Sequence, residues 1–417
     1  MKRNLYKSII FAVVLSLTSI LYFSGCVNKG SPSLYSGVPT GPIGATPKII
    51  SITPPNSALA GVTKIIIKGQ NFSNDTSKVF VYFNGQMGKV LSSTTTQITV
   101  TPPNIVGNSI KIMAAILNSE LFSNTINYSL HAAAKDIYPG SKSTFILPYG
   151  IASDNKGDIF MSIYNGGSKG VKEITPDSIV TDFAPRGAET FWNSLKVGSD
   201  GTLYGARYVR AVFKLTSGKA PSVYVILPTG VFITQLDFDP SGNLWASGKG
   251  GIFKIVPVVK TVTKFDFTPE VTALRIFKDG GTVYLYVAAL QDSTTKIERF
   301  PLDAKDNLGK AEVYYDFSAK YGADYKVNAL DFSQDGDMFL GTNSPQPIIV
   351  VHPDKSSEAL YPAVIEPGAV FSFTWAKTGS SYLYYTRLQT LDAQGNIVYS
   401  QKLIKLNIQK PGAPIYQ

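Results

Sequence analysis

The chain has 417 residues, of which 44% are apolar and only 16% are charged, a composition typical of a folded, strand-rich protein and not of a disordered one. Its formal net charge is +10, but the positive residues are scattered, so the charge pattern does not indicate a nucleic-acid-binding arm. With one cysteine, Cys26, and two histidines, His131 and His352, the sequence excludes an intrachain disulfide and a cysteine-based zinc site.

Residues 1–25 have the pattern of a secretory signal peptide. A basic start precedes an apolar run over residues 9–23, which is shorter than the roughly 20 residues of a membrane-spanning helix. The run ends in Ser24-Gly25-Cys26, which resembles the processing box of bacterial lipoproteins. The resemblance implies cleavage before Cys26 and acylation of its thiol and amine, with palmitate as a typical chain, and two or more chains anchor a protein stably. The alternative is an uncleaved N-terminal helix with an incidental cysteine.

Val27 follows the cysteine, where the lipoprotein signal for inner-membrane retention would place an aspartate. We therefore expect the outer membrane of a diderm bacterium, with the periplasmic and surface leaflets both open. Residues 26–46 are rich in Gly, Ser and Pro and are expected to form a flexible tether, about 25 Å long in root-mean-square terms.

Residues 47–130 alternate β-type runs with turn clusters at roughly ten-residue intervals, which predicts a β-sandwich. Asn84-Gly85 is a typical hairpin turn because both residues tolerate positive φ. The stretch resembles the IPT/TIG immunoglobulin-like domain, which implies either a non-catalytic spacer or a module that contacts carbohydrate or protein. The matching segments are Ile52-Thr53-Pro54, Gly61, Ile67-Lys68-Gly69-Gln70-Asn71-Phe72, Val81-Tyr82-Phe83-Asn84-Gly85 and the run from Thr96 to Pro102.

Residues 131–417 repeat one unit six times. Each unit has a turn glycine with an aromatic three residues later, and the units recur every 40 to 55 residues or so, a spacing typical of propeller blades. The residues six and four positions before each glycine are mostly apolar, which indicates an inner strand with one buried face. The repeat resembles NHL and related six-bladed propellers. The turn glycines are Gly157, Gly201, Gly242, Gly280/Gly281, Gly336 and Gly379.

The predicted fold class is therefore all-β, an immunoglobulin-like β-sandwich followed by a six-bladed β-propeller. Blades one to five each contain a third and a fourth strand, whereas blade six lacks a fourth strand of its own. Residues 135–138, ahead of blade one, resemble the missing outer strand. We expect them to pair with blade six, which closes the ring and removes its open edges.

The inner strands of a propeller enter a central channel, where ligands commonly bind. The residues eight positions before the turn glycines form an uncharged ring that can hydrogen-bond and stack a sugar or a small neutral ligand. The alternative is a water-filled channel lined by ordinary loop residues. Five loop aromatics either widen this site or pack between loops: Phe191, Trp192, Phe232, Tyr321 and Tyr325. The ring consists of Tyr149, Asn193, Thr234, Thr272, Asn328 and Phe371.

Several features bear on catalysis. Sugar-lactonase propellers open blade one with Glu-Gly-Pro, whereas this chain has Pro148-Tyr149-Gly150, which puts calcium-dependent hydrolysis in doubt. His352 falls at the end of a third strand, away from the channel expected to hold a lyase histidine. Asp-rich turns at 154–158, 303–309 and 392–396 are explained by turn chemistry more simply than by calcium. We predict no catalytic residue, metal ligand or cofactor.

The leading hypothesis is a non-enzymatic, lipid-anchored envelope protein that binds a glycan, a peptide or an envelope protein through the propeller channel, with no nucleic-acid partner. A rival is a propeller hydrolase or lyase, similar to sugar lactonases. A third possibility is a purely structural assembly subunit.

Overall fold

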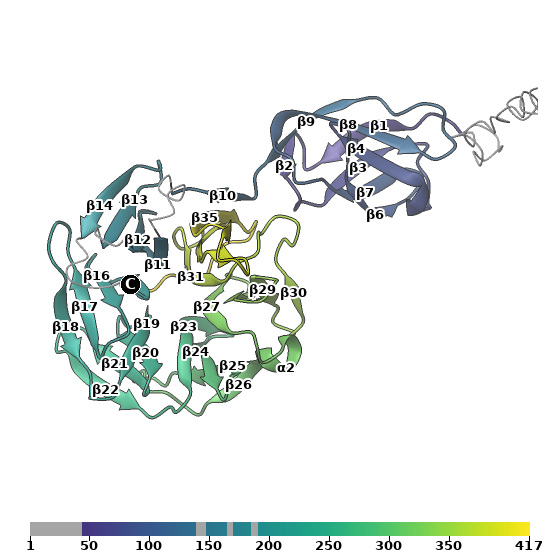
Figure 1. The fold of residues 1–417 in the computed structure, drawn as a ribbon. Coiled ribbons are helices and arrows are strands. Elements are labelled where there is room, and N and C mark those ends of the chain that lie inside the picture. The colour runs from purple at the N-terminus through teal and green to yellow at the C-terminus, as the bar shows by residue number, and fades with distance from the viewer. Residues whose placement is uncertain (1–43, 139–146, 165–169, 185–190) are drawn as a thin grey trace, which may run out of the picture.

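The structure is a computed structural model that describes residues 44–138, 147–164, 170–184 and 191–417. Within these ranges nearly all regular structure is strand, arranged as a two-sheet sandwich and a ring of six four-stranded sheets (Figure 1). The predicted fold class is therefore confirmed. The signal peptide, Cys26 and the tether up to residue 43 lie outside the described residues. In the described part of the chain, no helix is both long and apolar enough to cross a membrane.

The sandwich consists of one sheet in the order β1-β3-β7-β6 and a second in the order β2-β9-β8-β4-β5, in which β2 and β9 are parallel. A single turn of 3-10 helix, η1 (Thr76–Lys78), precedes β4. The strands are β1 (Lys48–Thr53), β2 (Ser57–Leu59), β3 (Ile65–Gln70), β4 (Val79–Phe83), β5 (Gln86–Met87), β6 (Lys89–Ser93), β7 (Gln97–Thr101), β8 (Gly107–Ile116) and β9 (Ile126–His131).

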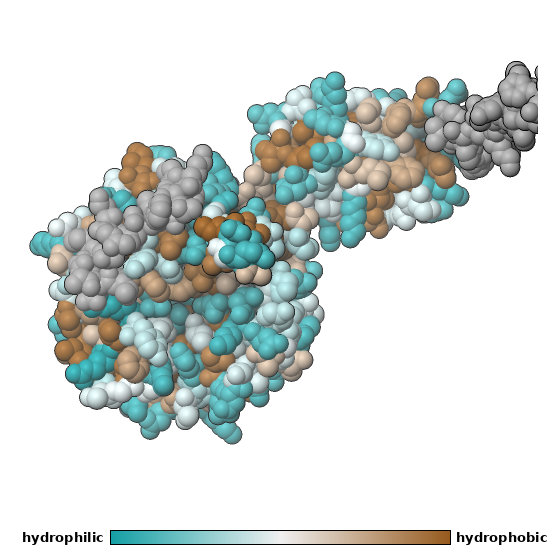
Figure 2. Space-filling model, in the orientation of Figure 1, coloured by the Kyte–Doolittle hydropathy of each residue, from teal (hydrophilic) through white to brown (hydrophobic). Residues whose placement is uncertain are grey.

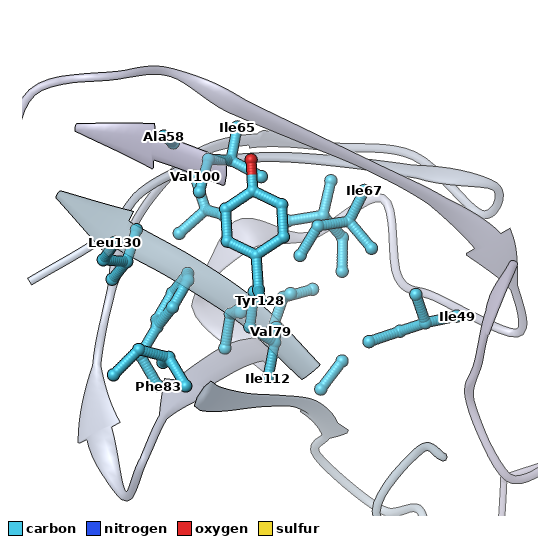
Figure 3. Close-up of a cluster of buried hydrophobic side chains, with 14 of the residues drawn as sticks. Ile49, Ala58, Ile65, Ile67, Val79, Phe83, Val100, Ile112, Tyr128 and Leu130 are labelled. Carbon is cyan, nitrogen blue, oxygen red and sulfur yellow. The ribbon is translucent and has the colours of Figure 1, made fainter. Parts of the chain in front are cut away.

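The sandwich core follows from period-two burial. In β4, Val79, Val81 and Phe83 are buried while the residues between them are half-buried. The ring of Tyr128 lies among these side chains (Figure 3), and its hydroxyl donates to the carbonyl of Pro54 at 2.7 Å. Burial raises the pKa of Tyr128 to about 12, so this donor keeps its proton. The hairpin after β4 also has the predicted form, with φ of 47° at Asn84 and 83° at the following glycine.

Each propeller blade is a sheet whose strands run outwards in chain order, except for the outermost strand of blade six. A short helix, α2 (Phe317–Tyr321), follows blade four, and a two-stranded hairpin of β33 (Thr390–Leu391) and β34 (Ile397–Tyr399) is inserted in blade six. Blade one consists of β11 (Leu147–Ser153), β12 (Ile159–Tyr164), β13 (Val171–Ile174) and β14 (Val180–Ala184), and blade two of β15 (Ser194–Val197), β16 (Leu203–Ala206), β17 (Ala211–Leu215) and β18 (Ser222–Ile226). Blade three consists of β19 (Phe232–Phe238), β20 (Leu244–Lys249), β21 (Ile252–Val256) and β22 (Thr261–Phe265), and blade four of β23 (Glu270–Asp279), β24 (Thr282–Gln291), β25 (Thr294–Pro301) and β26 (Glu312–Asp316). Blade five consists of β27 (Val327–Phe332), β28 (Met338–Thr342), β29 (Ile348–Val351) and β30 (Ser357–Ala359), and blade six of β31 (Val370–Trp375), β32 (Tyr382–Arg387), β35 (Lys402–Asn407) and β10 (Ala134–Asp136).

The inner hairpins have the turn chemistry that the repeat predicts. Every turn glycine has positive φ, for example 94° at Gly157 and 83° at Gly242, a conformation that strains other residues. The residues six and four positions before these glycines are all buried, as Leu236 and Phe238 show in blade three. These side chains pack in hydrophobic clusters, each of which contains residues of two neighbouring blades. Packing between blades therefore holds the ring together.

The ring closes as predicted. Strand β10 pairs antiparallel with β35, with Lys135 opposite Lys405 and Asp136 opposite Ile404. In Figure 1, β10 follows directly from the sandwich and lies at the outer edge of blade six. Just after it, buried Tyr138 packs in one cluster with Leu403 of blade six and with residues of blade one. The segment that joins the two domains therefore also closes the propeller.

We expect proline at position 137 to weaken this closure. The amide of Ile137 donates to the carbonyl of Leu403 at 3.1 Å, and proline has no amide hydrogen to donate. The lost bond should cost roughly 1–3 kcal/mol and speed amide hydrogen exchange in β35. Ile137→Ala, which keeps the amide, is the control. Equal exchange protection of β35 in the two variants would show that this bond does not hold the ring shut.

The C-terminal segment, residues 409–417, crosses the channel at the end where the inner hairpins turn. The amide of Ala413 donates to Phe332 of blade five at 3.0 Å, and the Gly412 amide donates to Ser380 of blade six at 2.8 Å. Further along, Gln417 contacts Ser153 of blade one, so the C-terminus lies among the inner strands (Figure 1). Because each inner strand runs from the ring of candidate residues to its turn glycine, this segment covers the channel end opposite that ring.

The sandwich contacts the propeller beside blade six. The side-chain amide of Asn104 donates to the carbonyl of Ala363 at 3.4 Å, and Thr63 bonds to Gln409 at 3.1 Å. The sandwich backbone also comes close to the propeller at Gly61, whose φ is 70°. A Cβ at this position would lie 2.9 Å from the side chain of Val364. On the face that Figure 2 shows, apolar residues lie in small separate groups among polar ones.

Candidate functional site

The six candidate ring residues lie together at the end of the channel opposite the turn glycines, where the described residues leave an opening, and all six are half-buried. In five of the blades the residue lies at a β-bulge, where the inner strand has an extra residue relative to its partner, for example Thr272 between the Val271 and Ala273 pairs. A bulge redirects the side chain locally and is common beside binding sites. The repeat thus places these residues at equivalent positions around one opening.

Three aromatic side chains meet at this opening. Tyr149 of blade one stacks on Phe191, with ring centroids 3.8 Å apart and an angle of 6° between the planes. Phe371 of blade six meets Tyr149 edge to face at 5.3 Å and Phe191 at 5.8 Å. Burial raises the pKa of Tyr149, so its hydroxyl remains a neutral donor. We call this cluster of Tyr149, Phe191 and Phe371 the aromatic platform.

Three other ring residues bond to the next blade. The hydroxyl of Thr272 donates to the carbonyl of Val327 at 2.6 Å, and the amide of Asn328 donates to Val370 at 3.2 Å. Thr234 makes the equivalent, longer bond to Val271 at 3.4 Å. Because these donors already have acceptors, their first role is to tie the inner strands together. A role for the ring in ligand binding stays a prediction.

The channel inside this opening is narrow. A cavity of about 20 Å³ is lined by Asn193, Asn328 and Phe371, together with Ser194, Gln235 and Ser372. A buried water needs roughly 10–15 Å³, so this space holds one or two waters and not a sugar ring. A ligand larger than one or two waters must therefore bind at the rim of the channel.

Sequence reasoning missed a buried charged network deeper in the channel. Arg275 donates from Nε to Asp331 at 2.8 Å and from Nη1 to Asp237 at 3.0 Å, and its Nη2 donates to the carbonyl of Pro414 at 2.7 Å. Lys196 forms an ion pair with the other oxygen of Asp237 at 3.0 Å. These residues come from blades two to five and lie five positions before the turn glycines, so the same alignment could have found them.

In this network the attraction between opposite charges outweighs the effect of burial on the pKa values of Asp237 and Arg275. Burial alone would raise the pKa of Asp237, but the charges of Lys196 and Arg275, with the amide of Ile276, lower it overall. For Arg275, burial would lower the pKa, but Asp331 and Asp237 raise it overall. Both groups are therefore charged at neutral pH, and the channel carboxylates are already paired with protein cations.

The five loop aromatics divide between the two expected roles. Phe191 joins the aromatic platform, while Phe232 stacks on Tyr208 at 4.7 Å. Trp192 is fully buried and packs on Phe213. Two lie away from the channel cavity in the blade-four and blade-five core, Tyr321 and Tyr325.

The acidic turns serve the backbone. Asp154 accepts from the amides of residues 156, 157 and 158 through one oxygen, at 2.9 Å each. Asp303 and Asp392 accept hydrogen bonds from the amides of their own turns in the same way.

His352 follows β29 and bonds through Nδ1 to Asp337 at 2.7 Å. Within the described residues, no group of three or more His, Cys, Asp or Glu side chains is arranged to hold a metal ion.

Comparison with known families identifies the first domain. Residues 47–129 match the IPT/TIG domain family, in agreement with the predicted sandwich. No curated protein matches the sequence.

Solved structures resemble the chain at low sequence identity. A protein of Bacteroides thetaiotaomicron, provisionally described as a phosphatase, is 13% identical, with 87% of this chain and 97% of that chain covered at a TM-score of 0.53. Regucalcin of Agrobacterium tumefaciens, a calcium-binding protein, is 18% identical, with 68% and 97% covered at 0.52. A gluconolactonase of Xanthomonas campestris is 14% identical, with 67% and 89% covered at 0.50. Likeness at these identities shows the fold alone.

Proposed function

We propose that this chain is a non-enzymatic binding protein of the cell envelope. In this proposal acyl chains on Cys26 anchor it to a membrane, most simply the outer membrane of a diderm bacterium. The tether and the sandwich hold the propeller away from the lipid, and the open end of the channel binds a glycan, a peptide or a protein partner.

The observation that carries the proposal is the aromatic platform. Tyr149, Phe191 and Phe371 come from different parts of the chain and meet at one opening, where Asn193 adds a polar group. Apolar and aromatic surface with a few placed polar groups is the usual composition of a ligand site. Because the cavity below is only about 20 Å³, the ligand would lie across the rim. This favours a segment of a glycan chain or a protein loop over a small enclosed molecule.

The rival hypothesis is a lactonase-like hydrolase, and the charged network argues for the binding function instead. In the channel the carboxylates of Asp237 and Asp331 already pair with Arg275, and Lys196 pairs with Asp237 as well. A calcium ion would have to compete with these internal cations. A calcium-dependent rise in melting temperature together with turnover of a lactone panel would favour the hydrolase.

The platform gives a direct binding test. The full-length chain, purified in detergent, is screened against a glycan array and against envelope proteins, and each hit is titrated. We expect Tyr149→Ala and Asn193→Ala each to weaken binding about tenfold, which corresponds to about 1.4 kcal/mol, since each removes part of the rim.

A control variant separates binding from folding. Tyr382→Ala changes an exposed aromatic at the start of β32, outside the candidate ring. It should bind as the wild type does. Affinity unchanged by Tyr149→Ala and Asn193→Ala would reject the open channel end as the binding site.

A further inference from the structure

A second pocket lies outside the channel, between the sandwich and blade six. Its volume is about 270 Å³, close to the lower end of the roughly 300–1,000 Å³ range of small-molecule sites. Asn104 of the sandwich forms one wall, and Val364 and Glu366 from the connection between blades five and six form another. The floor is one face of blade six. This space is more than ten times larger than the cavity in the channel.

Strand register shows which side chains share the floor. Asp136 of β10 lies opposite Ile404 of β35, which in turn lies opposite Tyr385 of β32. In the next row of the same face, Arg387 lies directly opposite Lys402. Two like charges placed directly opposite on antiparallel strands repel each other. An anion bound between them would relieve that repulsion.

Arg387 has an unused donor. Its side chain is only 1% exposed; Nη1 bonds to Glu366, and Nη2 donates to the carbonyl of Ser400 at 3.0 Å. Its Nε is also buried but has no hydrogen-bond partner among the residues that the structure describes. A buried donor without an acceptor is costly, and most such groups in folded proteins are paired.

The existing ion pair leaves room for a second anion. The hydrogen bond from Arg387 lowers the pKa of Glu366, so this carboxyl is charged at neutral pH. Glu366 is 53% exposed and occupies only Nη1, whereas the guanidinium is held in place by burial. The charge of Lys402 also lowers the pKa of Glu366, so a ligand carboxylate between Arg387 and Lys402 would share these two cations with the half-exposed Glu366.

We infer that this interdomain pocket binds a small hydroxylated carboxylic acid of monosaccharide size, a uronic acid. The ligand carboxylate would lie between Lys402 and Arg387. Its hydroxyls would face Asp136 and Asn104. Such a ligand contacts both domains, so it would also fix the sandwich against the propeller. The inference does not depend on the proposed channel function.

The test is calorimetric titration of the full-length chain with D-glucuronate, with D-glucose as an uncharged ligand of similar size. We expect glucuronate to bind at least tenfold more tightly than glucose, and its affinity to fall as salt rises. Lys402→Gln should weaken glucuronate binding tenfold or more. Lys405→Gln is the matched control, because Lys405 is on the same strand but faces the rings of Tyr382 and Tyr384 on the other side of the sheet. It should leave the affinity unchanged.

Three results would overturn the inference. The first is no binding of glucuronate, or equal binding of glucuronate and glucose. The second is an equal effect of Lys402→Gln and Lys405→Gln while both variants keep the wild-type melting temperature. The third is loss of glucuronate binding in Tyr149→Ala but not in Lys402→Gln, which would place the anion at the channel opening. Failure of the channel proposal alone would leave the Lys402 effect intact.

Discussion

Replacing Arg275 with methionine is expected to destabilise the propeller by roughly 3–5 kcal/mol, the usual cost of breaking a buried ion pair from one side. The guanidinium is 2% exposed and bonds to two aspartates that are themselves buried, Asp237 and Asp331. Methionine fills much of the space but leaves these carboxylates without a shared cation. Urea unfolding followed by tryptophan fluorescence measures the loss.

The loss should depend on pH with a definite sign. In the wild type the net shift lowers the pKa of Asp237, so its contribution to stability is present above the unfolded-state pKa and disappears as pH falls through the lower folded-state pKa. Without Arg275 one of the two attractions is gone, and the folded-state pKa of Asp237 rises relative to the wild type. The variant then loses less stability on acidification. The gap between the two proteins should be largest at pH 7 and narrower near pH 4.

A second arginine on the same blade is the control. Arg299 pairs with Asp279 at 2.9 Å and with Glu312, but these partners are about half exposed. Arg299→Met should cost about 1 kcal/mol, because solvent screens such pairs and the lost ring contacts are weak. Adding Asp237→Asn and Asp331→Asn to Arg275→Met should recover part of the loss. If Arg275→Met and Arg299→Met lose equal stability, the channel network is no more important than a surface pair.

The blades could be predicted from sequence because their turn chemistry is local. A glycine at positive φ, as at Gly201 and Gly336, and a period-two strand before it are readable within ten residues. Ring closure followed from one missing strand, and residues near Lys135 supplied a match for it. The sandwich could be predicted because the IPT/TIG pattern is itself continuous in the chain.

The alignment places the residues of the channel network at one repeat position, but which of them pair could not be predicted in the same way, since the partners come from different blades. Lys196 and Asp237 are 41 residues apart, and Arg275 and Asp331 are 56 apart. Each of these residues lies five positions before its turn glycine, between the two apolar residues. A period-two pattern predicts only that such a residue is on the other face of the strand, and not what it contacts. The interdomain pocket is harder still, because it depends on how the loop with Asn104 packs against blade six. Sequence patterns identify the elements, whereas these sites arise from contacts between elements.

Deleting residues 409–417 is expected to cost about 2.5–6 kcal/mol of propeller stability. Arg275 would lose the carbonyl of Pro414 as an acceptor, which costs roughly 1–3 kcal/mol for a buried donor. The backbone at Gly412 covers the ring of Trp375, which is fully buried in the intact chain. Exposing that ring, and losing the contacts of Tyr416 with blades three and four, should cost roughly a further 1.5–3 kcal/mol.

Point variants distinguish this packing from a general effect of shortening the chain. Gly412→Ala in the full-length protein should reproduce much of the loss, because a Cβ there would overlap the ring of Trp375. Pro414→Ala keeps the carbonyl that Arg275 needs and should be nearly neutral. Ligand affinity at the aromatic platform should be unchanged in all of these proteins that remain folded, since the segment covers the opposite end of the channel. An unchanged unfolding midpoint after the deletion would show that the segment rests on the propeller without stabilising it.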